Sequence, residues 1–166
     1  LFRSFDYKSN QSDLEKKIFE NFGLNLSFTS KAKYNIFPSP RLNIKNVEIL
    51  SFSERSNNVG SAKKVILKIP FKKLVSLKTL NFDSAELINA DINIQTSEID
   101  NFNNYLNNRI HEKPIQLTQS KINLLDKSNL LLNIDLKKLH ISGKNLFNKL
   151  DLQGRVFNTK IKINYQ

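Results

Sequence analysis

The chain has 166 residues, which is enough for one domain with its own hydrophobic core, and its formal net charge is +11. It contains no cysteine, and this excludes disulfides, thiolate zinc sites and iron–sulfur clusters. No segment approaches the roughly 18 consecutive apolar residues of a membrane-spanning helix, and no basic-then-apolar leader is present. Methionine is also absent, even at position 1, so we expect residues 1–166 to be a single domain excised from a longer protein.

The positive charge suggests an anionic partner, either a nucleic acid or a phospholipid surface. A compositional explanation competes with it, because heavy use of asparagine, lysine and isoleucine is what an AT-rich genome produces whatever the function. The lysines are dispersed, as at Lys63, Lys68 and Lys78, without an arginine cluster or a basic stripe with interleaved aromatic residues. We therefore expect no nucleic-acid partner.

The first predicted element is a short amphipathic helix at residues 12–22. It opens with the capping-box pattern Ser-Asp-Leu-Glu, and apolar residues then follow at helical spacing. Gly23 can end the helix in a left-handed conformation. From residue 24 onward apolar and polar residues alternate, which predicts strands.

The next strands are predicted around 41–49, 65–69 and 82–95. The alternation slips at Lys45–Asn46, which indicates a bulge. Between 82 and 95 apolar residues fall on both parities, so we expect a kink or a change of buried face near Ile88.

A second helix is predicted near 97–109, and a brief helical turn at 71–77. Strands return at 115–124, 130–136 and 157–165. The short polar breaks between them, at 126–129 and 142–145, are typical of hairpin connections.

The predicted fold class is α+β, mostly β. We expect a curved, largely antiparallel sheet with two or three short helices and space for an open apolar groove.

The sequence is poor in groups that carry chemistry. His111 and Glu112 begin like a zinc-protease motif, but Ile115 stands where the second histidine ligand would be required. The glycines are scattered and form no phosphate-binding loop, and no Gly-x-Ser-x-Gly elbow occurs. We expect no enzyme activity, no catalytic residue, no metal site and no cofactor, and we expect a domain that binds along an apolar sheet surface.

Alternating strands allow two arrangements of that surface. Two apolar faces can pack on each other and close the core, or the few short helices can leave part of one face open as a groove. Periodicity alone favours the closed core, since most half-apolar sheets are halves of sandwiches.

The order of these elements resembles the N-terminal region of the AsmA family of bacterial envelope proteins, relatives of TamB in the bridge-like lipid-transfer group. The resemblance covers residues 12–96: a helix ending at Gly23, a short strand, a proline-containing stretch leading into the strand at 36–49, an alanine-led strand and short helix at 61–74, and a further strand at 80–87. The later strands suit the continuing sheet of the family. One departure is Lys-Ala-Lys at 31–33, where members often carry a glycine.

The resemblance implies a periplasmic domain tethered to the inner membrane by a segment upstream of residue 1. It implies a role in phospholipid transport and outer-membrane biogenesis, with phospholipid acyl chains on the apolar face, an anionic membrane surface near the lysines and envelope proteins as further partners. It thereby favours the open groove. Strand parity gives these groove candidates: Val65, Leu67, Ile69, Ile92, Ile94, Leu117, Ile134, Ile161 and Ile163.

Two alternatives stay open. The first is a structural or protein-interaction domain of envelope assembly with a closed core, which offers an unpaired strand near Ile161 to a neighbour. The second, ranked below it, is a basic β-domain that binds nucleic acid, which requires lysines concentrated on one face.

Overall fold

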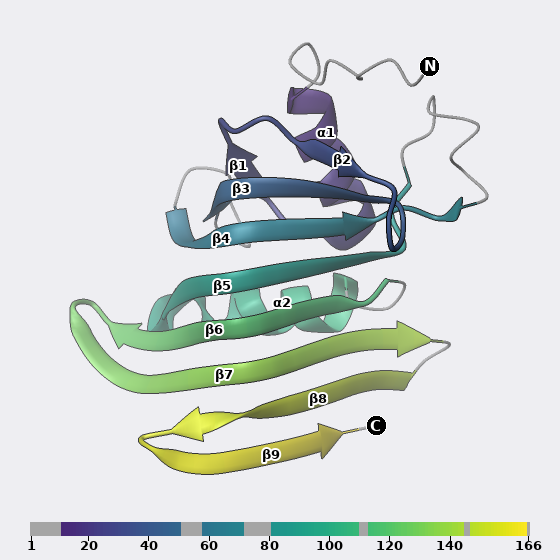
Figure 1. Ribbon diagram of the computed structural model, residues 1–166. Coiled ribbons are helices and arrows are strands. Elements are labelled where there is room, and N and C mark those ends of the chain that lie inside the picture. Colours follow the sequence, from purple (N-terminus) through teal and green to yellow (C-terminus); the bar gives the residue numbers. More distant parts are fainter. Residues whose placement is uncertain (1–10, 51–57, 72–80, 110–112, 145–146, 166) are drawn as a thin grey trace, which may run out of the picture.

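Within the residues that the structure describes, the protein forms one curved sheet with two α-helices, as the sequence predicts for a mostly β member of the α+β class (Figure 1). The computed structural model describes residues 11–50, 58–71, 81–109, 113–144 and 147–165. The helices are α1 (Gln11–Phe22) and α2 (Ile99–Arg109). The strands are β1 (Leu26–Phe28), β2 (Lys33–Asn35), β3 (Arg41–Leu50), β4 (Asn58–Lys68), β5 (Ser84–Gln95), β6 (Ile115–Asp126), β7 (Asn129–Lys144), β8 (Phe147–Val156) and β9 (Thr159–Tyr165).

The strands follow one another across the sheet in the order β1-β3-β4-β5-β6-β7-β8-β9, and β2 pairs with the other half of β3. Every neighbouring pair is antiparallel except β5 and β6, which are parallel. Parallel neighbours need a crossover connection, and α2 lies in this one. The predicted hairpin at 126–129 is confirmed, because β6 and β7 pair antiparallel across it, whereas β9 pairs with β8 and not with β7.

Helix α1 ends as the sequence predicts. Gly23 has φ 65°, and its backbone N–H donates to the Phe19 carbonyl oxygen over 2.7 Å, which is a left-handed C-terminal cap. Leu14, Ile18 and Phe22 lie on one side of the helix and are buried.

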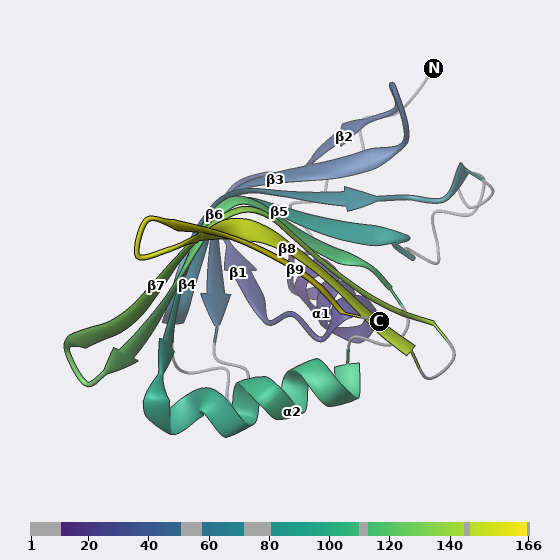
Figure 2. The same ribbon diagram turned by 90° about the horizontal axis from the view of Figure 1, so that it is seen from below.

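A line of backbone irregularities, which we call the crease, crosses the sheet. At this line the alternation of buried and exposed residues along the strands shifts by one position. Asn46 in β3, Asn89 in β5 and Gln119 in β6 all have φ near +50°, and the register between β7 and β8 shifts around Lys137. The pairing places these irregularities on corresponding positions of neighbouring strands. Bulges and left-handed residues bend strands, and the sheet accordingly wraps around its helices (Figure 2). The predicted slip at Lys45–Asn46 and kink near Ile88 lie on this crease.

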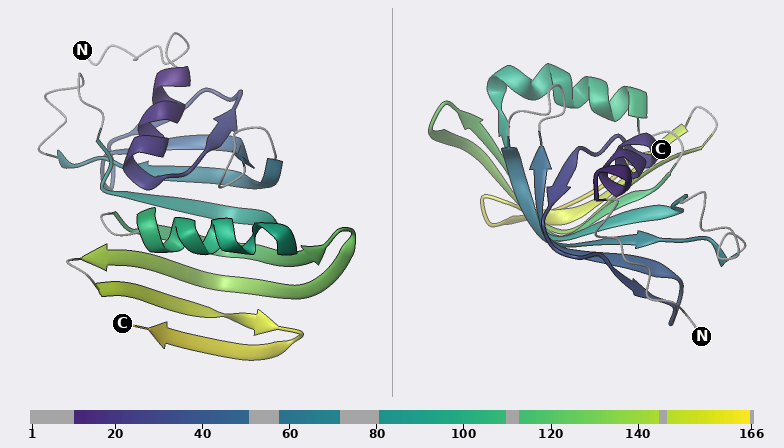
Figure 3. Two further views of the ribbon diagram at one scale, coloured as in Figure 1. Left: turned by 180° about the vertical axis from the view of Figure 1, so that it is seen from behind. Right: turned by 90° about the horizontal axis from the view of Figure 1, so that it is seen from above.

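Both helices lie on the same side of the sheet, which we call the inner face; the opposite side is the outer face (Figure 3). The rings of Phe22 and Phe82 stack with centroids 6.4 Å apart beneath α1. The Tyr105 hydroxyl of α2 donates to the Phe22 carbonyl oxygen over 3.0 Å, and this bond joins the two helices. In the part of the chain that the structure describes, neither helix is long and apolar enough to span a membrane.

Several sequence predictions need correction. Strand β8 was not predicted, because Gly154 and alternating charged residues weaken its apolar signal. Strand β7 continues to Lys144, so the predicted break at 142–145 is wrong over its first three residues. Phe157 lies in the β8–β9 turn with φ 45° and not in a strand. The predicted turn at 71–77 lies almost entirely outside the described residues.

Candidate functional site

The most extensive apolar feature of the inner face is a row of aliphatic residues that crosses seven strands. Each member is the direct cross-strand partner of the next. The row runs Ile44, Val65, Leu87, Leu117, Leu139, Leu152 and Ile163. All its side chains are aliphatic, from β3 to β9, but their burial differs. Ile44 is fully buried, whereas Ile163 is 47% exposed.

The change in burial follows the placement of the helices. In Figure 3 α1 lies over the first strands of the sheet and α2 over its middle, whereas β8 and β9 extend beyond α2. Apolar side chains of the inner face past α2 are accordingly only partly buried or exposed. We call these residues the open inner face: Leu124, Leu132, Ile134, Leu150, Leu152, Val156, Ile161 and Ile163.

A small apolar cavity lies where the covered and open parts of the inner face meet. Its volume is about 50 Å³, and Phe102 and Tyr105 of α2 roof it. Its floor consists of aliphatic side chains from four strands of the sheet and from the segment after α1: Leu24, Ile49, Leu87, Ile92, Ile94, Ile115, Leu117, Ile122, Leu139 and Ile141. The cavity is too small for an acyl chain, but its apolar lining continues directly into the open inner face through Ile122.

The nine sequence-predicted groove candidates separate into three groups. Val65, Leu67 and Ile69 belong to the closed core and are not accessible as groove walls in this structure. Ile92, Ile94 and Leu117 are also buried, but they line the cavity beneath α2. Ile134, Ile161 and Ile163 lie on the open inner face. The residues of the first two groups are therefore buried, as the closed-core alternative predicts. Only the residues of the last group lie on an open surface.

Five residues of the open inner face were missed from the sequence: Leu124 and Leu132 although their strands were predicted, and three more because β8 was not predicted. Leu150, Leu152 and Val156 come from that strand, and Gly154 interrupts them between Leu136 and Ile161. A Cβ at Gly154 would collide with the Asp135 carbonyl oxygen, so this position has no side chain. The alternation of apolar residues at even positions from 150 to 156 was the signal that could have revealed the strand.

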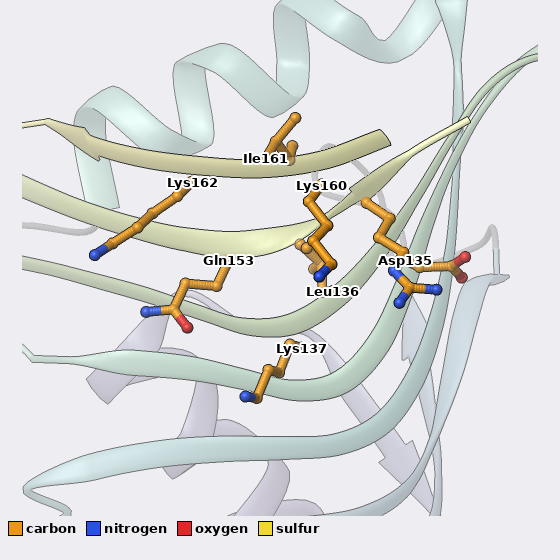
Figure 4. Close-up of a pocket in the computed structure, with 9 residues that line it drawn as sticks. Asp135, Leu136, Lys137, Gln153, Lys160, Ile161 and Lys162 are labelled. Atoms are coloured by element: carbon orange, nitrogen blue, oxygen red, sulfur yellow. The ribbon is translucent and has the colours of Figure 1, made fainter. Parts of the chain in front are cut away.

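The outer face of the same strands is basic. A hollow of about 700 Å³ lies over β7, β8 and β9, and its charged side chains are four cations and one carboxylate (Figure 4). The lining residues are Asp135, Leu136, Lys137, Gln153, Gly154, Arg155, Lys160, Ile161 and Lys162. In β9 the side chains alternate, so that Ile161 lies on the opposite side of the strand from Lys160 and Lys162 (Figure 4).

The carboxylate of the hollow has a partner outside it. Asp135 Oδ1 lies 3.9 Å from Lys121 Nζ, and both side chains are half exposed. Such an exposed ion pair contributes little to stability. Lys121 nevertheless partly neutralises the Asp135 carboxylate, which is the negative charge of the hollow. The four cations therefore outweigh the acid, and this surface can attract phosphate or carboxylate groups.

Within the described residues, no group of three or more His, Cys, Asp or Glu side chains is placed to hold a metal ion. The pKa of the Glu20 carboxyl is lowered, first by the hydrogen bond from Lys17 over 2.6 Å. This pair lies on the exposed side of α1, away from the open inner face.

No protein-family model matches the sequence, and no curated protein matches it significantly.

Proposed function

We propose that this chain is a lipid-binding β-sheet module of an AsmA-like protein, anchored in the inner membrane, with a role in phospholipid transport and outer-membrane biogenesis. In this proposal the module is periplasmic, and phospholipid acyl chains lie on the open inner face. The single observation that supports it most is the apolar row whose members pass from full burial at Ile44 to exposure at Ile163. The family resemblance of residues 12–96 supports the same conclusion.

The physical basis is the cost of exposed aliphatic surface. Burying apolar groups is favourable by about 0.8 kcal/mol per methylene, and a sheet face needs no catalytic group to gain this free energy from an acyl chain. The open inner face is contiguous across four strands, β6 to β9, whereas scattered single apolar residues on a protein surface carry no such implication. A flexible chain can follow the curvature of such a surface.

A protein-interaction role is the second candidate. Strand β9 pairs only with β8 among the described strands, so its other edge presents backbone donors and acceptors to a further strand. A partner strand added at β9 would also cover Ile163 from the side. The two candidates differ in what contacts Ile163 from the inner face, which is lipid in the first and protein in the second.

One feature of the structure favours the nucleic-acid alternative, and another argues against it. The cations of the outer hollow lie on one face, as that alternative requires. However, none of the described residues that line the hollow is aromatic, so these residues offer bases no stacking platform. We therefore keep phospholipid as the proposed ligand.

A photo-crosslinking residue tests the proposal inside bacterial cells. We expect benzoylphenylalanine in place of Ile163 to yield adducts with the mass of phospholipid, because this side chain is exposed on the inner face. The matched control replaces Lys162, the next residue, whose side chain lies on the outer face. Lipid adducts at 163 and not at 162 support the proposal. Protein adducts alone at 163 would replace it with the interaction role.

A further inference from the structure

A second exposed apolar feature lies at the other end of the strand order from β9. Ile36 and Phe37 belong to the connection between β2 and β3, and Phe71 follows β4. Phe37 is 85% exposed and Phe71 is 63% exposed. Both segments leave the sheet at the same end of their strands, because Arg41 of β3 pairs with Lys68 of β4 in the last rung (Figure 1). We call these three residues the apolar tip.

Hydrogen bonds fix the backbone behind this tip. The Arg41 guanidinium donates to the Phe37 carbonyl oxygen over 3.1 Å, and the Ile69 N–H donates to the Pro40 carbonyl oxygen over 2.9 Å. The β2–β3 connection is thus tied both to β3 and to the segment that carries Phe71. Phe37 therefore projects into solvent from a fixed loop. The folded protein bears the free-energy cost of exposing this apolar side chain to water.

Positive charge surrounds the apolar tip. Arg41 and Lys68 lie at the strand ends that carry it, and Lys33 lies two residues further back in β2, beside Asn43 of β3. The one carboxylate there in the described chain is Asp83, whose N–H donates to the Lys68 carbonyl oxygen over 2.8 Å. In the sequence Phe71 is followed directly by two further lysines. Protruding apolar side chains with flanking cations are the combination that binds the interface of an anionic bilayer.

The opposite end of the strands provides an internal comparison. Leu130 and Leu131 are exposed at the β6–β7 hairpin, beside the start of α2. The Thr96 hydroxyl donates to Asp126 Oδ1 over 3.3 Å and joins these two segments, where the carboxylates of Glu98, Asp100 and Asp126 outnumber the one cation, Lys127. Anionic headgroups would be repelled at this end. Both ends of the strands expose apolar residues, and it is the sign of the surrounding charge that distinguishes them.

From this juxtaposition we infer that the apolar tip inserts into the surface of a bilayer that contains anionic phospholipid. Ile36, Phe37 and Phe71 enter the boundary between headgroups and acyl chains, and Lys33, Arg41 and Lys68 contact the phosphates. This docking surface is separate from the open inner face. It places the first edge of the sheet at the membrane and β9 at the far end of the strand order.

The absence of tryptophan from the chain allows a direct test. Phe37→Trp introduces a single indole at the tip, and Leu130→Trp introduces one at the acidic end. Each variant is mixed with vesicles of phosphatidylethanolamine and phosphatidylglycerol that carry brominated acyl chains. We expect a blue-shifted emission and strong bromine quenching at position 37, and neither change at position 130. Absence of quenching at position 37, or equal quenching at both positions, would overturn the inference.

Removal of the tip is the complementary experiment. In vesicle sedimentation, Phe37→Ser with Phe71→Ser is expected to lower the partition coefficient by at least about 10-fold. Both side chains are exposed, so the fold, checked by circular dichroism, is expected to persist. Vesicles of phosphatidylcholine alone should bind the unmodified protein weakly. Binding that the double substitution leaves unchanged would contradict the inference, whatever is found for lipid on the open inner face.

Discussion

Replacing Leu152 and Ile161 together with aspartate is expected to weaken binding of a fluorescent phospholipid analogue by at least about 100-fold, because two apolar contacts are lost and two carboxylates meet the acyl chains. Both residues lie on the open inner face and are only partly buried, so the sheet can keep its fold while its surface changes. Titration of the purified protein with the analogue measures the effect.

The matched control adds the same charge to the other side of the same two strands. Gln153→Asp with Asn164→Asp also introduces two carboxylates into β8 and β9, but on the outer face. We expect this control to retain affinity within a few-fold. If both double variants lose binding equally, the effect is electrostatic or structural, and the open inner face is not the lipid site.

Phe22→Ala is expected to lower the free energy of unfolding by about 3–5 kcal/mol, the typical cost of removing a buried phenylalanine. Phe22 is 1% exposed, and its ring stacks on Phe82 between α1 and the sheet. The truncation leaves a cavity at the centre of the covered part of the core. Urea unfolding followed by circular dichroism measures the loss.

Phe157→Ala serves as the control for this prediction. Phe157 lies in the β8–β9 turn and is 67% exposed, so its truncation is expected to change the free energy of unfolding by less than about 0.5 kcal/mol. Equal destabilisation by the two substitutions would contradict the division of the molecule into a covered core and an open end.

Local features of this fold are readable from the sequence. The helical spacing of Leu14, Ile18 and Phe22 and the glycine that follows them predict α1 and its end, and the parity slip at Lys45–Asn46 predicts the crease. The predicted capping box is wrong, because Ser12 lies inside the helix and Glu15 Oε1 accepts from the Phe28 N–H over 3.3 Å. These signals depend on neighbouring residues, and so a single sequence contains them. Strand β8 escaped because Gly154 replaces an inward side chain at its centre, where β7 approaches too closely for a Cβ.

The position of the open surface cannot be predicted from the sequence in the same way. Val65 and Ile163 both occupy inward-facing positions of their strands, yet the first is fully buried and the second is 47% exposed. The difference arises from the parallel β5–β6 crossover, which places α2 over the middle strands, while neither described helix lies over β8 and β9. Such a nonlocal arrangement leaves no trace in strand parity, and for this reason the nine candidates include both core and surface residues.

Native mass spectrometry of the unmodified protein, purified from bacteria without detergent, tests the central claim most directly. We expect a folded protein with an added mass that matches phospholipid and that organic extraction removes. A folded protein that carries no lipid, and that takes up none from added vesicles, would contradict lipid binding on the inner face and would favour a role in protein interaction.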